Sequence, residues 1–156
     1  MKKYFDRPHK EIFPKEKILV LRSIAINKIK SNLLPNKKII KIILIGSSVK
    51  NNFGKYAPPG FRGSLFSDFD FIVFVEEDYK IPKWLDKEPA GKPFPDAKLN
   101  LAYRNKNFVE DKYDIEVFFI RKSNMADPKI QKLGELAGIP MTPTTTHEHL
   151  VIYSKD

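Results

Sequence analysis

Cysteine is absent from the 156-residue chain, which excludes disulfide bonds, thiolate zinc sites and a cysteine nucleophile, and fits a reducing compartment. Long apolar runs are absent too. The two longest, Ile39–Ile45 and Phe69–Val75, are each interrupted by a charged residue and are far too short to span a membrane. The charged residues 1–8 lead into no apolar segment of the signal-peptide kind. These absences predict a soluble, cytoplasmic protein with no membrane partner.

Positive charge is concentrated at the start of the chain. The formal net charge is +9, and residues 1–50 carry thirteen Lys or Arg against three acids, so the remainder is close to neutral. Such a region suggests a polyanionic partner, either a nucleic acid or the phosphates of a nucleotide, or a contact surface for another protein. A solvated helix face in a lysine-rich chain accounts for the same charge equally well.

The composition is that of one globular domain spanning residues 1–156, with 42% hydrophobic and 30% charged residues. Apolar residues at helical spacing predict a basic amphipathic helix over about 16–34. Runs rich in β-branched and aromatic residues predict strands over 38–45, 69–75, 98–103, 113–120 and 148–153. Segments rich in glycine or proline predict connections over 46–66 and 76–96, and an Asp-Pro start with a later glycine predicts a helix over 127–136. The fold class that follows is α/β (α+β), with a mixed, partly antiparallel sheet of about four to five strands flanked by helices.

Two of the predicted strands carry pairs of acids. Asp68 and Asp70 lie two residues apart at the start of one strand, so their side chains share a face. A lone carboxylate in the apolar run around Asp70 is costly, and two like charges cost more unless a cation lies between them. Mg²⁺ with oxygen ligands is the usual solution, commonly together with substrate phosphates. Asp114 and Glu116 repeat the arrangement, and one of them meets the first pair if the two strands are neighbours; acids on the solvent face of an edge strand are the alternative.

The order of these features resembles the nucleotidyltransferase superfamily related to DNA polymerase beta. Gly46-Ser47 follows one predicted strand, Ser67-Asp68-Phe69-Asp70 opens a second, and an acid stands on a later one. The resemblance covers about residues 38–120 as catalytic core, followed by the C-terminal helix and edge strand at about 127–153. It implies a phosphate-contacting turn, a metal-binding pair and a third acid that helps to activate the attacking hydroxyl. The residues that match are Gly46, Ser47 and Ser48 for the turn, Asp68 and Asp70 for the pair, and Asp114 for the third acid with Glu116 as the alternative; Lys50, Arg62 and Ser67 are further candidates for nucleotide contacts.

The resemblance also implies the reaction, with Mg²⁺ (or Mn²⁺) as cofactor and an NTP such as ATP as substrate. A hydroxyl of an unidentified small molecule, protein or RNA attacks the α-phosphate, and pyrophosphate leaves. Two alternatives have the same fold: a non-catalytic nucleotide- or RNA-binding module, and the nucleotidyltransferase half of a toxin–antitoxin pair. The 22 positions from Gly46 to Asp68 exceed the spacing usual in minimal members of the superfamily. The extra segment is either a loop that binds the substrate or an insertion with no role in the site.

Overall fold

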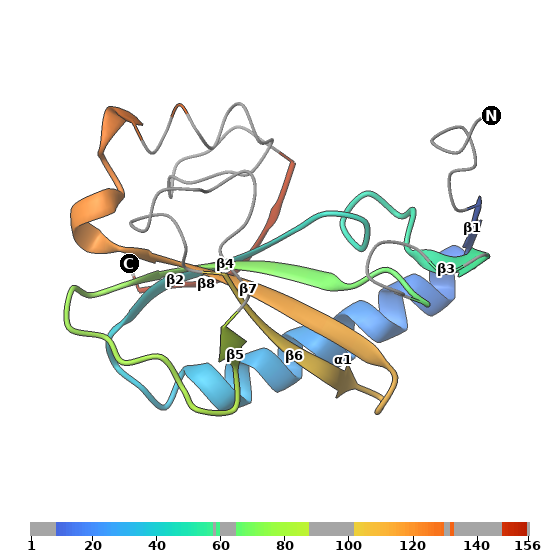
Figure 1. Cartoon of the computed structure of the whole chain (residues 1–156), viewed down its shortest axis with the longest axis horizontal. Helices are drawn as coiled ribbons and strands as arrows, with labels where there is room; N and C mark the ends of the chain where they lie inside the picture. Colours follow the sequence, from blue (N-terminus) through green and yellow to red (C-terminus); the bar gives the residue numbers. More distant parts are fainter. Residues whose placement is uncertain are drawn as a thin grey trace.

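The computed structural model describes residues 9–57, 59, 65–87, 102–129, 132 and 148–155. Within them, six strands form one sheet in the order β5-β6-β7-β4-β2-β8, and β1 pairs with β3 in a separate two-stranded ribbon (Figure 1). The elements are β1 (His9–Ile12), α1 (Lys15–Leu33), β2 (Ile39–Ile45), β3 (Gly54–Ala57), β4 (Phe69–Val75), β5 (Asp86–Lys87), β6 (Ala102–Val109), β7 (Tyr113–Arg121) and β8 (Leu150–Ser154), with a short 3₁₀ turn at Lys122–Asn124. β4 and β7 run parallel, whereas the other paired strands of the sheet run antiparallel. The expected mixed α/β fold is confirmed.

Helix α1 covers one face of the sheet (Figure 1). Its apolar stripe of Ile18, Leu21, Ala25, Ile29 and Leu33 is fully buried, because these positions recur on one side of a 3.6-residue helix. Every second residue of β4, from Phe69 to Val75, belongs to the same buried cluster. Burying each large side chain of this kind contributes about 1.5–3 kcal/mol, so this layer is the main source of stability for the strands that carry the acids.

The opposite face of the sheet carries both apolar and acidic side chains. Ile72 and Phe74 of β4 pack there with Phe118 and Ile120 of β7 in a second buried cluster. Because side chains alternate along a strand, Asp70 lies on this same face, two positions before Ile72. The acids therefore stand at the starts of β4 and β7, on the side of the sheet turned away from α1.

Some segments differ from the sequence-based expectation. Two strands lie in segments that were expected to be connections. β3 pairs with β1 in the separate ribbon, and the two-residue β5 becomes the sixth strand of the main sheet. β3 forms because Gly54 admits the backbone of β1 so closely that a Cβ there would lie 2.1 Å from the carbonyl oxygen of Glu11. The expected strand over 98–103 overlaps β6 only at its last two residues, and residues 98–101 lie outside the described part. Of the expected helix over 127–136, Pro128, Lys129 and Lys132 are helical, and most of the rest is not described.

Among the residues described, no helix combines the length and the apolar character needed to cross a membrane.

Candidate metal centre

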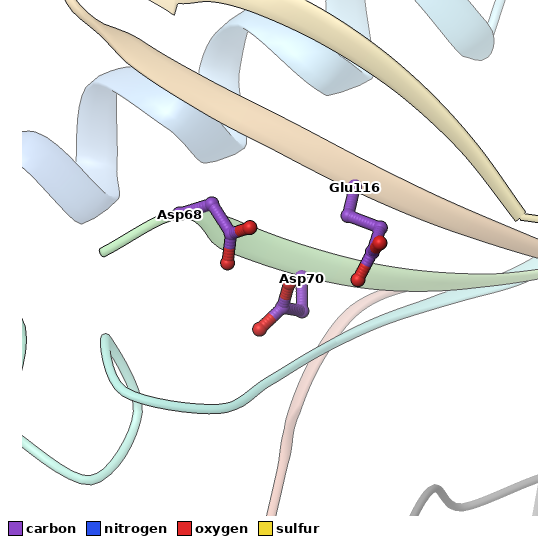
Figure 2. Close-up of side chains that lie close together, drawn as sticks. All are labelled: Asp68, Asp70 and Glu116. Atoms are coloured by element: carbon purple, nitrogen blue, oxygen red, sulfur yellow. The ribbon is translucent and has the colours of Figure 1, made fainter. Parts of the chain in front are cut away.

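Three carboxylates from two neighbouring strands gather at one point. The parallel pairing of β4 with β7 places Asp70 directly opposite Glu116. One oxygen from each of Asp68, Asp70 and Glu116 lies within 4.8 Å of the other two. Figure 2 shows these three side chains on the same side of the two strands, directed toward a common region. All three side chains are partly buried. The spacing of their oxygens would allow one cation to contact all three.

The third acid of this group is Glu116, the alternative at the sequence level, and Asp114 lies outside the group. Asp114 is instead hydrogen-bonded through both oxygens: Oδ2 accepts from Arg104 Nη1 at 3.1 Å and Oδ1 from the backbone N–H of Asn107 at 2.9 Å. The register explains the difference, since Asp70 is level with Glu116 and not with the residue two positions earlier. The structure thus gives these two acids different surroundings although they share a strand face.

Arg104 is the central cation of the site, and the sequence analysis did not identify it. It lies on β6 opposite Glu116, and its Nη2 donates to Asp68 Oδ2 at 3.0 Å and to Glu116 Oε2 at 3.5 Å. Together with the bond to Asp114, one guanidinium therefore links three acids. The strand expected over 98–103 ends one residue before Arg104, and the polar residues that follow gave no signal for a strand beside the acids.

The surroundings of Asp70 disfavour its ionised form. Burial raises the pKa of Asp70 well above its ordinary value of 3.8, and the negative charge of Asp68, a hydrogen bond with Asp68 and the charge of Glu116 raise it further. Arg104 opposes these effects only in part. A carboxyl group in this position either keeps its proton or needs a cation. Three carboxylate oxygens are a suitable ligand set for Mg²⁺ or Mn²⁺, so the residues present fit the expected metal.

The glycine turn after β2 lies directly against Asp70. Gly46 has a φ of +86°, and a Cβ at this position would come within 2.6 Å of Asp70 Oδ2. Its carbonyl oxygen accepts hydrogen bonds from the N–H groups of Val49 and Lys50, each at 3.1 Å, which closes the turn. Only glycine combines this backbone conformation with such close approach. The expected phosphate-contacting turn is therefore next to the acids, with Ser47 as its second residue.

The other residues expected to contact a nucleotide have different surroundings. Ser67 is buried, and its Oγ accepts from the N–H of Gly54 at 3.1 Å, so it ties β3 to the start of β4. Ser48 is fully buried in the turn, and its carbonyl oxygen accepts from Arg22 Nη1. Lys50 is exposed, and Arg62 lies outside the described residues.

A second cation acts on the site from β1. Burial lowers the pKa of Lys10 below its ordinary value, and the negative charge of Asp68 opposes this shift in part. The Lys10 ammonium also lies 5.6 Å from the ring centre of Tyr56, its partner on β3. The ribbon of β1 and β3 thus brings a positive charge near the acids; no strand was expected at β1, and β3 lies in a segment expected to be a connection.

Basic side chains of α1 contact the protein itself. Lys28 Nζ donates to the carbonyl oxygen of Phe108 at 2.6 Å, and Lys17 Nζ lies 4.1 Å from the ring centre of Phe13. Arg22 binds the glycine turn as described above. Some of the basic side chains at the start of the chain therefore make contacts within the protein that stabilise its fold.

Comparisons of the chain with protein-family models, with curated proteins and with solved structures gave no match.

Proposed function

We propose that this protein is a divalent-cation-dependent nucleotidyltransferase. The observation that carries the proposal is the convergence of Asp68, Asp70 and Glu116, whose oxygens lie within 4.8 Å of one another on two parallel strands. The raised pKa of Asp70 supports it, because a cation between the acids would offset the burial and the repulsion from Asp68 and Glu116 that raise this pKa. The glycine turn against Asp70 adds a stretch of backbone that a phosphate can approach.

In the proposed reaction an acceptor hydroxyl oxygen forms a bond to the α-phosphorus of an NTP. The bond from that phosphorus to the oxygen that bridges to the β-phosphate breaks, and the electron pair leaves with pyrophosphate. Asp68, Asp70 and Glu116 are the residues that would hold Mg²⁺ or Mn²⁺, which supplies charge neutralisation for the phosphates when bound. The hydroxyl proton passes to a carboxylate of the site or to solvent. Such a reaction needs mainly positioning and charge compensation, which this small set of residues can provide.

A hydroxyl of a small molecule, an RNA or a protein fits the chemistry, including a protein acceptor in a toxin–antitoxin pair. ATP is the first NTP to try. We place the activity in the cytoplasm, where Mg²⁺ and nucleoside triphosphates occur together.

A non-catalytic nucleotide-binding module is the second candidate, and Arg104 is the observation that favours it. Its guanidinium balances the negative charges of Asp68 and Glu116 without any metal. The presence of these partly buried acids is therefore compatible with a site that has no catalytic role. In that case the protein binds a nucleotide but transfers nothing.

Label transfer separates the two candidates. Each α-labelled NTP is incubated with the protein and Mg²⁺ or Mn²⁺, with and without cell extract as a source of acceptor. Glu116→Gln removes one carboxylate of the site, and Glu16→Gln makes the same change at an exposed position of α1, on the other face of the sheet. We expect transfer by the unmodified protein and by Glu16→Gln, and none by Glu116→Gln. Metal-dependent NTP binding without transfer would favour the second candidate, and the absence of both would refute the proposal.

A further inference from the structure

The two ends of the Arg104 guanidinium have different partners. Nη1 donates to Asp114, which is not in the metal-compatible group, whereas Nη2 donates to Asp68 and Glu116, which are. The backbone N–H of Asn107 holds the other oxygen of Asp114. Asp114 is therefore a fixed anchor for one end of the guanidinium, while the other end lies between two candidate metal ligands.

We propose that Arg104 is a displaceable counter-ion of this site, occupying the place between Asp68 and Glu116 until a divalent cation takes it. The inference rests on the proposed function, since it treats these acids as metal ligands. A cation bound by both carboxylates competes with Nη2, which now contacts one oxygen of each at 3.0 Å and 3.5 Å. Displacement of Nη2 by the metal breaks two charge-assisted hydrogen bonds of Arg104, which lowers the affinity of the free protein for metal.

Asp114 gives the displaced arginine a second use. Because Nη1 remains bound to Asp114, the guanidinium stays beside the site after Nη2 is released. A planar guanidinium whose Nη2 has left the carboxylates is well suited to bind phosphate oxygens. The side chain is 23% exposed, so it lies within reach of a ligand at the surface of the site. Arg104 then binds the triphosphate that accompanies the metal, which couples metal binding to nucleotide binding.

The test measures metal affinity directly, so that it does not depend on turnover. Mn²⁺ is titrated into the protein and the free ion is followed by electron paramagnetic resonance, for the unmodified chain, Arg104→Gln and Lys10→Gln. The lysine variant removes one positive charge that acts on Asp68, but leaves the guanidinium contacts in place. We expect Arg104→Gln to bind Mn²⁺ about tenfold more tightly, since it loses hydrogen bonds to charged groups that compete with the metal. Lys10→Gln should gain much less, and Arg104→Gln should bind an NTP in the presence of Mg²⁺ more weakly.

Unchanged or weaker Mn²⁺ binding by folded Arg104→Gln would overturn the proposal. An equal gain in Mn²⁺ affinity in Lys10→Gln would overturn it too, because the loss of one positive charge would then explain the effect. If Arg104→Gln does not fold, Arg104→Lys makes the same comparison, because it keeps the charge but loses the planar fork. It should show a smaller gain in Mn²⁺ affinity, and unchanged affinity would count against displacement. Binding by Arg104→Gln but not by the unmodified chain, with an NTP present as well as without it, would support displacement while contradicting the proposed function. Absence of binding in all variants would contradict both.

Discussion

Asp70→Asn should make the metal-free protein more stable while removing its response to metal. The substitution keeps the shape of the side chain and removes a carboxyl group whose ionisation would place a third negative charge within 4.8 Å of the other two. At an effective dielectric constant of about 20, one pair of unit charges 4.8 Å apart repels by roughly 3.5 kcal/mol. Arg104 and partial exposure to solvent reduce this value, and we expect a net gain of about 1–2 kcal/mol in the free energy of unfolding near neutral pH.

The pH dependence gives the same substitution a second readout. The folded-state pKa of Asp70 is raised, so the folded protein holds a proton that the unfolded chain has already lost once the pH exceeds the ordinary value of 3.8. The stability contributed by Asp70 is therefore fully present below that value and is lost as the pH rises toward the raised pKa. The advantage of Asp70→Asn over the unmodified protein should accordingly grow from pH 5 to pH 8.

Urea denaturation in EDTA and in MgCl₂ measures both effects. In EDTA the variant should unfold at higher urea, whereas saturating Mg²⁺ should stabilise only the unmodified protein, by about 1.4 kcal/mol at ten times its dissociation constant. A variant that is less stable than the unmodified protein in EDTA at pH 8 would refute the electrostatic reasoning. Equal stabilisation of both proteins by Mg²⁺ would show that Asp70 is not a ligand.

Other substitutions separate ligands from supporting residues. Glu116→Gln should weaken Mn²⁺ binding by about tenfold or more and Asp114→Asn much less, as measured by calorimetry, and the reverse order would assign the ligand role to Asp114. Gly46→Ala should cost about 1–2 kcal/mol of stability in urea denaturation from its positive φ alone, and should also weaken metal binding by displacing Asp70; a neutral result would rule out the tight contact. Ser67→Ala should cost about 1–2 kcal/mol through the unpaired N–H of Gly54 yet retain label transfer, whereas loss of transfer in a folded variant would restore its nucleotide-binding role.

The central strands and the first acid pair were predictable because their signals are local. β2, β4 and β7 are short runs of β-branched and aromatic residues whose burial requires a sheet, and α1 has an apolar stripe at helical spacing. Asp70 is conspicuous because it interrupts one of these runs. Whether β4 and β7 are neighbours was left open by the sequence, and the structure pairs them in parallel.

The features that depend on register were not predictable. Whether Asp114 or Glu116 meets Asp70 depends on the alignment of two parallel strands that residues 76–112 separate, which no local pattern encodes. Arg104 stands in a polar strand that forms by pairing with β7 and not by burying a hydrophobic run. The ribbon of β1 and β3, which carries Lys10, likewise depends on the close approach of two segments at Gly54.

A crystal structure with Mn²⁺ and a non-hydrolysable NTP, using the anomalous signal of manganese, tests the metal site most directly. We expect a peak coordinated by carboxylate oxygens of Asp68, Asp70 and Glu116, with the triphosphate next to the turn at Gly46 and Arg104 no longer bridging Asp68 and Glu116. A peak that these three residues do not share, or no peak at saturating Mn²⁺ with nucleotide bound, would contradict it.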